Sequence, residues 1–122
     1  MKNQAYRMAM LYDFYGDLLT DRQKEFYDLY YNEDLSLAEI AENYGITRQG
    51  VRDVIVRAEA YLTEIEDKTG LIRRFHTMQG QLRQVADCVQ QVLDLNDAKL
   101  GSDELELLAE RIKSLTNTLI QE

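Results

Sequence analysis

The chain has 122 residues with a single cysteine, no proline, and 22 acidic against 14 basic side chains, so its formal net charge is −8. This length suits one compact domain, or a small domain with a helical appendage. One cysteine excludes an intramolecular disulfide, no run of 18 apolar residues could cross a membrane, and residues 1–4 lack the apolar segment of a signal peptide. We therefore expect a cytoplasmic protein.

Apolar residues recur at spacings of three and four along the whole chain, which predicts an all-α fold. The first helix should span about residues 4–15 and end at Gly16. A second helix should begin after Thr20, because Thr20-Asp21-Arg22-Gln23 fits a reciprocal capping box, and should end at Tyr30 or Tyr31.

Residues 36–47 carry the capping and turn signals of a helix-turn-helix. Ser36 and Glu39 fit another capping box, and the short helix that they begin should end at Tyr44. Gly45 then stands where the backbone needs a positive φ, and Thr47 can cap the next helix. A short helix, a tight glycine turn and a longer helix together present a helix end to the DNA major groove.

The longer helix should run from Arg48 to about Glu66. It should bury one face, at spacings of four, three and four, made of Val51, Ile55, Ala58 and Leu62. We place a boundary after this helix, with a helix-turn-helix domain over residues 1–66 and a C-terminal helical hairpin over residues 67–122. Ten of the eleven aromatic residues precede the boundary.

The second half carries two series of apolar residues with seven-residue repeats, joined by a short loop at residues 96–102. Such repeats favour coiled-coil pairing, and the short loop predicts an antiparallel hairpin. The hairpin should pack on a second copy, on the first domain, or on both; we favour a homodimer built largely by this half over a purely intramolecular bundle. Cys88 should be buried in this seam. The residues expected to form it are Leu82, Val85, Val89, Leu108, Ile112, Leu115 and Leu119.

Nucleic-acid contacts are expected at the start of the long helix. Arg48 and Arg52 are four residues apart and share a face with Gln49; arginine can bind guanine, and glutamine adenine, through two hydrogen bonds. Ser36 and Thr47 stand at helix starts, where a hydroxyl and free N–H groups suit a phosphate. Arg22 and Lys24 could add contacts to the DNA backbone. The competing interpretation is that Arg48, Gln49 and Arg52 are only a solvated helix face.

Arg57 lies about half a turn around the long helix from Arg48 and should instead pair with an acidic residue of an earlier helix, such as Glu39 or Glu25, and so stabilise the fold.

The overall negative charge of the chain argues against nucleic-acid binding. Residues 1–62 and residues 63–122 each carry 7 basic and 11 acidic side chains, so each half has a net charge of −4. Because phosphate neutralisation supplies most non-specific affinity, DNA binding must rest on a local cluster of cations.

The sequence shows no catalytic constellation. His76 has no second histidine or cysteine at ligand spacing, so it indicates neither a metal site nor general acid–base chemistry. The carboxylates are scattered, and no glycine-rich phosphate loop is present. The tyrosines could stack on single-stranded nucleic acid, but their helical spacing favours a core role. We expect a protein that is not an enzyme and has no cofactor.

The stretch from Leu19 to Leu62 resembles region 4 of bacterial sigma factors, which recognises the −35 promoter element. About 18 residues precede it, so we do not expect a complete sigma factor. The matching positions are Leu19, Arg22, Gln23, Leu37, Glu39-Ile40-Ala41, Gly45-Ile46-Thr47, Val51, Arg57-Ala58 and Leu62.

Nearly the whole chain is similar to the YlxM-like family of small helix-turn-helix proteins of Gram-positive bacteria. The runs MLYDFYGDLLT (residues 10–20), ITRQGVRD (residues 46–53) and KTGL (residues 68–71) carry this resemblance. The family is commonly encoded beside the GTPase of the signal recognition particle and is described as a regulator or accessory of that pathway. The resemblance therefore implies a cytoplasmic all-α dimer linked to protein targeting.

Three hypotheses remain open. The first is a transcriptional regulator that binds double-stranded DNA through Arg48, Gln49 and Arg52. The second is an accessory that binds the signal recognition particle RNA or its GTPase, because acidic helices could complement a basic targeting protein. The third is a structural dimer whose helix-turn-helix has become a protein-contact surface.

Overall fold

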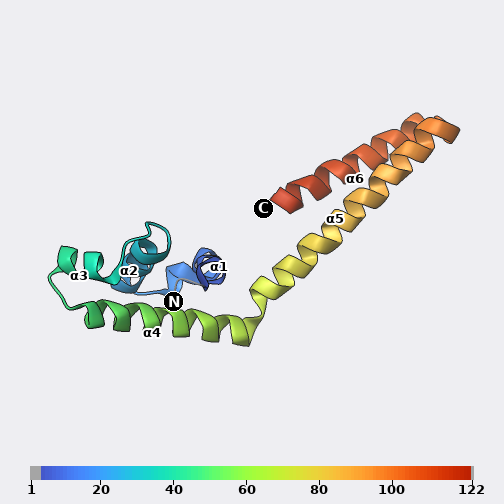
Figure 1. The fold of residues 1–122 in the computed structure, drawn as a ribbon. Coiled ribbons are helices and arrows are strands. Elements are labelled where there is room, and N and C mark those ends of the chain that lie inside the picture. The colour runs from blue at the N-terminus through green and yellow to red at the C-terminus, as the bar shows by residue number, and fades with distance from the viewer. Residues whose placement is uncertain (1–3, 122) are drawn as a thin grey trace. The chain divides into compact units, whose positions relative to one another are not determined.

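The computed structural model describes residues 4–121 (Figure 1). These residues form six α-helices and no strand, which confirms the all-α prediction. They divide into two compact units, one ending at Ile72 and the other beginning at Arg73. Each unit has its own packing, and the two are described separately.

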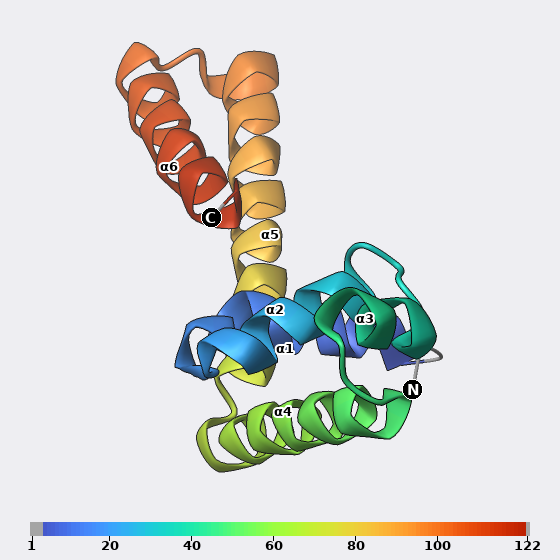
Figure 2. The same cartoon turned by 90° about the vertical axis from the view of Figure 1, so that its left-hand side faces the viewer.

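The first unit contains four α-helices: α1 (Ala5–Tyr15), α2 (Asp21–Tyr31), α3 (Leu37–Tyr44) and α4 (Arg48–Thr69). A 3₁₀ turn, Gly16–Leu18, follows α1. In Figures 1 and 2, α1, α2 and α3 all lie on the same side of α4. The long helix thus forms one layer, and its apolar face is covered along its length.

The helix starts follow from local chemistry. Thr20 accepts a hydrogen bond from the Gln23 N–H at 3.2 Å while the Gln23 side chain accepts from the Thr20 N–H, which confirms the first capping box. At the other end of the unit, α4 extends to Thr69, three residues beyond its expected end. It stops at Gly70, whose φ of 62° is a conformation that glycine adopts without strain.

The core is aromatic and continuous with the apolar face of α4. Val51, Ile55, Ala58 and Leu62 are fully buried, as predicted. Phe26 and Tyr27 of α2 are also fully buried. The Tyr27 hydroxyl donates to the Met8 carbonyl oxygen at 2.5 Å, so this buried polar group has a partner.

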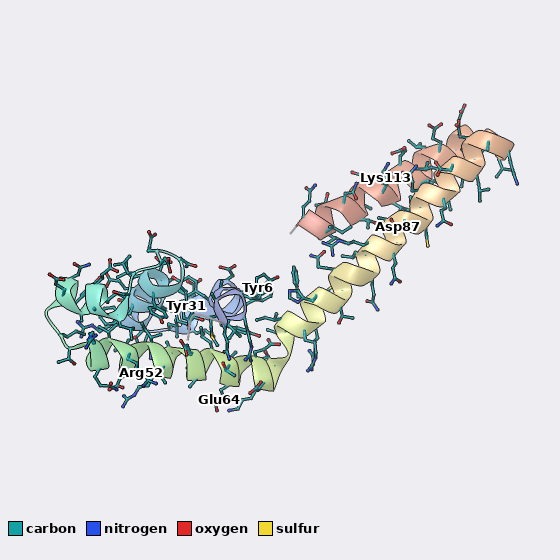
Figure 3. All side chains as sticks on the ribbon, in the orientation of Figure 1. Tyr6, Tyr31, Arg52, Glu64, Asp87 and Lys113 are labelled. Carbon is teal, nitrogen blue, oxygen red and sulfur yellow. The ribbon has the colours of Figure 1, made fainter. Side chains whose placement is uncertain are left out.

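Two further tyrosines tie earlier helices to α4. The Tyr15 hydroxyl lies 2.6 Å from Glu66 Oε1, and the Tyr31 hydroxyl donates to Glu59 (Figure 3). Burial, and then the hydrogen bond to Glu66, raise the pKa of Tyr15. Most of the tyrosines are therefore buried or half-buried, as the spacing predicted, whereas Tyr6 and Tyr61 are exposed.

The second unit is an antiparallel hairpin of α5 (Leu71–Leu95), whose first two residues belong to the first unit, and α6 (Asp103–Gln121). The helices lie side by side in both views (Figures 1 and 2). A π-helical turn, Asn96–Leu100, joins them and ends at Gly101 with φ 61°. The Asn96 side chain closes the turn through two 2.9 Å hydrogen bonds to the Ser102 backbone.

The internal face of the hairpin is narrow and partly polar. Its buried residues are Gln79, Val89, Asn96, Ala109 and Thr116. Of the seven seam residues, Val89 is buried and Leu82 half-buried; the other five, Val85, Leu108, Ile112, Leu115 and Leu119, are exposed.

Cys88 is exposed, so its predicted burial is wrong. It follows Val85 by three residues and precedes Val89 by one. One residue turns a helix by about 100°, so Cys88 points away from the internal face that Val89 enters.

Candidate nucleic-acid interface

The turn between α3 and α4 brings two helix starts together. Gly45 ends α3 in the left-handed region, with φ 67° and ψ 32°. The N–H groups of Gly45 and Ile46 both bind the Ala41 carbonyl oxygen, the latter at 3.1 Å. Ile46 packs against the core cluster that includes Ile40 and Val51. The corner is therefore fixed by hydrogen bonds and by apolar packing.

The five residues expected to contact nucleic acid line a single cleft of about 680 Å³ between the start of α3 and the start of α4. All five are exposed. They are Ser36 and Thr47, which precede the two helices, and Arg48, Gln49 and Arg52 in the first two turns of α4. The structure thus brings together residues that lie up to sixteen positions apart in the sequence.

Both hydroxyls cap a helix. Ser36 Oγ accepts from the Glu39 N–H at 3.1 Å, and Thr47 Oγ1 accepts from the Gly50 N–H at 2.9 Å. In each cap the oxygen is the acceptor, so the hydroxyl hydrogen is still able to donate to an anion. The cleft therefore offers two donors beside two helix N-termini, where the helix dipole favours negative charge.

The charged part of the cleft belongs to α4. Arg48 and Arg52 are one turn apart, and Arg52 is labelled on the exposed side of α4 in Figure 3. Gln49 Nε2 donates to Asp53 Oδ1 at 2.9 Å. This bond fixes the Gln49 amide, and it also places a carboxylate beside the cleft that would repel phosphate.

Three more residues line the cleft that the sequence did not single out: Tyr30, Leu37 and Ala38. Tyr30 is the last but one residue of α2 and is buried, so it forms the floor. Leu37 and Ala38 are the first residues of α3, and their position directly after the Ser36 cap was the signal that could have identified them.

Two other basic residues of this unit, which could have added contacts to the DNA backbone, are engaged elsewhere. The Arg22 guanidinium lies 5.2 Å from the centroid of the Phe26 ring, and Lys24 forms an ion pair of 2.5 Å with Asp17. The hydrogen bond and charge of Asp17 raise the pKa of Lys24.

Arg57 is exposed, and no ion pair joins it to Glu39 or Glu25 among the described residues, so its expected pairing is wrong. Glu39 serves the Ser36 cap, and Glu25 accepts from the Tyr44 hydroxyl. Both carboxylates therefore have partners already, Glu39 at the N-cap of α3 and Glu25 on α3.

Within residues 4–121, no group of three or more histidine, cysteine, aspartate or glutamate side chains could hold a metal ion. None of the helices in this part of the chain combines the length and apolar character of a membrane span.

The model of the UPF0122 family, described as "Putative helix-turn-helix protein, YlxM / p13 like", matches residues 2–100. The chain belongs to the UPF0122 family. This confirms the YlxM-like resemblance, and the match covers the helix-turn-helix and all of α5. The cleft at the start of α4 thus lies inside the part of the chain that defines the family.

Relatives from three bacteria illustrate the extent of the similarity. A UPF0122 protein of Acetivibrio thermocellus is 38% identical over 120 residues, which is 95% of this chain and 99% of the relative. One from Halalkalibacterium halodurans is 39% identical over 115 residues, 94% of this chain and 99% of the relative. One from Desulforamulus reducens is 53% identical over 72 residues, 59% of this chain and 62% of the relative.

Proposed function

We propose that this UPF0122 protein is a cytoplasmic, non-enzymatic regulator that binds double-stranded DNA as a homodimer and needs no cofactor. One observation carries the DNA-binding part: Ser36, Thr47, Arg48, Gln49 and Arg52 line one exposed cleft at the start of α4. A helix-turn-helix family supplies the matching architecture.

In this proposal α4 enters the major groove with its N-terminal turns. Arg48 and Arg52 bind guanine edges, and Gln49 exchanges Asp53 for an adenine edge. Ser36 and Thr47 donate to phosphates and so fix the register of the protein on the duplex. A two-fold dimer then reads two half-sites whose centres lie about 10 base pairs apart, or a multiple of that.

The acidic chain limits non-specific affinity and shapes the choice of assay. With a net charge of −8, the molecule as a whole repels DNA, and the cations of the cleft must act against that field. Binding should therefore be weak on random sequence and detectable mainly at low salt, where the local cations are least screened.

The second candidate is an accessory of the signal recognition particle, which the YlxM-like resemblance implies. The net charge of −8 favours it, because an acidic surface complements a basic targeting protein. In that case the helix-turn-helix serves as the contact surface for the particle's RNA or GTPase.

A low-salt titration of a labelled duplex tests the first proposal. Arg48→Ala/Arg52→Ala should weaken binding by at least ten-fold, since each lost arginine contact costs about 1–3 kcal/mol. The matched control is Arg57→Ala/Lys68→Ala. It also removes two positive charges from α4, but from residues outside the cleft. The control should bind within about two-fold of wild type.

If both double variants lose DNA affinity equally, the loss reflects the general charge of the chain and not contacts in the cleft. That result would contradict the proposal. The same titration, run with signal recognition particle RNA and with the particle's GTPase, separates the candidates. Binding of either one without duplex binding would favour the accessory function.

A further inference from the structure

The hairpin has one polar side and one apolar side. On the polar side, Lys113 Nζ donates to Gln90 Oε1 at 2.9 Å (Figure 3). Gln90 also lines a cleft beside the turn whose other walls include five carboxylate residues, Asp94, Asp97, Asp103, Glu106 and Glu110. Solvated charges therefore cover this side.

The opposite side carries two rows of exposed apolar residues. Met78, Val85 and Val92 recur every seven residues along α5. On α6, Leu108 and Leu115 are seven apart, as are Ile112 and Leu119. All seven side chains are between 40% and 61% exposed. We call these seven residues the apolar face.

The two rows belong to one continuous surface. Met78 of α5 and Leu119 of α6 line the same apolar cleft of about 250 Å³, together with Phe75, Gln79 and Leu82. In an antiparallel pair of helices, each helix has residues that face its neighbour. Residues displaced in the same sense from these inward-facing residues lie on the same side of the pair. The exposed rows are therefore neighbours across the groove between α5 and α6, away from the Lys113–Gln90 bond.

This surface is large for an unpaired one. At these exposures the seven side chains present on the order of 600 Å² of accessible apolar surface per copy. This is close to the ~800 Å² that each partner contributes to a standard interface. Contiguous apolar patches above a few hundred Å² mark interaction sites on soluble proteins.

Charge is distributed unequally along the hairpin. Its open end, residues 73–86 of α5 and 111–121 of α6, carries five basic side chains (Arg73, Arg74, Arg83, Arg111 and Lys113) and no acidic one. The turn end, residues 87–110, carries seven acidic side chains and a single lysine. Figure 3 labels Asp87, the first acidic residue of α5.

We infer that the occupant of the apolar face is a second copy of this chain, packed with its hairpin antiparallel to the first. A two-fold axis across the middle of the hairpin sets each basic open end beside the acidic turn end of the partner. A parallel arrangement would instead place seven carboxylates against seven carboxylates. The resulting four-helix bundle buries both apolar faces.

Two exposed charged residues edge the apolar face and fix the orientation. Arg74 is four residues before Met78, and Glu104 is four residues before Leu108, so each shares a helix face with the apolar row. Arg74 lies at the open end and Glu104 at the turn end. In the antiparallel dimer, Arg74 of each copy lies at the same end of the bundle as Glu104 of the other copy.

This inference deepens the homodimer of the proposed function and does not depend on DNA binding, because the test uses the full chain without nucleic acid. In sedimentation equilibrium, wild type should approach twice its 14.2 kDa, and Leu115→Glu should sediment as a monomer. The control Asn117→Glu adds the same charge to α6 two residues away, where the helix turns out of the apolar face, and should stay dimeric.

A wild-type monomer, or a dimer that survives Leu115→Glu with an unchanged dissociation constant, would overturn the choice of surface. Far-UV circular dichroism of each variant checks that the helices remain. If Leu115→Glu loses helicity, the Glu104→Arg and Arg74→Glu variants, whose side chains are exposed, test the interface instead.

The orientation has its own test. Glu104→Arg and Arg74→Glu should each weaken the dimer roughly three- to ten-fold, and the double variant should recover most of the loss. Added salt should weaken the wild-type dimer. In a parallel dimer Glu104→Arg would relieve repulsion and strengthen association, as would salt, and either result would overturn the antiparallel arrangement.

Discussion

The two units of this chain place their apolar residues in opposite ways. In the first unit, aromatic and aliphatic side chains from four helices meet inside, and tyrosine hydroxyls at the edge find carboxylate or carbonyl partners. In the hairpin the inner face holds a valine, an alanine and three polar residues, while larger side chains such as Leu115 stand outside. Helical spacing alone does not reveal whether an apolar face is internal, because two helices have only one seam to share.

Truncating an apolar side chain should lower the free energy of unfolding more in the first unit than in the hairpin. Phe26→Ala removes a fully buried ring at the centre of the first unit and should lower the free energy of unfolding by about 3–5 kcal/mol. Val85→Ala, at a residue 43% exposed, should cost under about 1 kcal/mol in the monomeric Leu115→Glu background. Urea unfolding followed by circular dichroism at fixed protein concentration measures both. Similar costs at the two sites would contradict the distinction between the units.

A second variant tests whether the polar residues inside the hairpin stabilise it. Asn96 is buried, and both ends of its amide are bonded to the Ser102 backbone. Asn96→Leu leaves those backbone groups without partners and should cost about 1–3 kcal/mol. Unfolding of the full chain, compared with wild type at equal concentration, gives the value. A neutral result would mean that the turn is held by Gly101 and the helix packing alone.

Gln79 should behave differently, although it is also buried. Its Nε2 lies 3.3 Å from the Leu119 carbonyl oxygen, and its Oε1 has no hydrogen-bond partner in the described structure. Gln79→Leu removes that unpaired acceptor and adds apolar volume, so the change should be neutral or should stabilise the hairpin by up to about 1 kcal/mol. A loss as large as that of Asn96→Leu would show that the Gln79 oxygen is bonded after all.

Much of the first unit follows from short-range signals in the sequence. The capping boxes at Thr20 and Ser36, the left-handed Gly45 and the buried face of α4 depend on neighbouring residues, and all were predicted. The errors differ in range. The end of α4 is set by a local signal, Gly70, which was overlooked, whereas the Tyr44 partner of Glu25 depends on how α2 and α3 pack.

Five of the eight residues that line the cleft were singled out from the sequence, because Ser36, Thr47, Arg48, Gln49 and Arg52 all belong to one local motif. Their contact with nucleic acid stays a prediction. Tyr30 was missed, since its place in the cleft is set by the packing of α2 against α3. In the hairpin, Cys88 was misplaced because a series of apolar residues does not show which residues face the neighbouring helix and which face solvent.

We propose that the cleft at the start of α4 reads DNA sequence, and selection from a randomised duplex library with the wild-type chain tests this proposal. We expect enrichment of an inverted repeat with half-sites about 10 base pairs apart or a multiple of that, and relaxed preference at one base per half-site when Arg52→Ala is used. A library that stays random after repeated rounds, or an enriched motif that Arg52→Ala leaves unchanged, would contradict it.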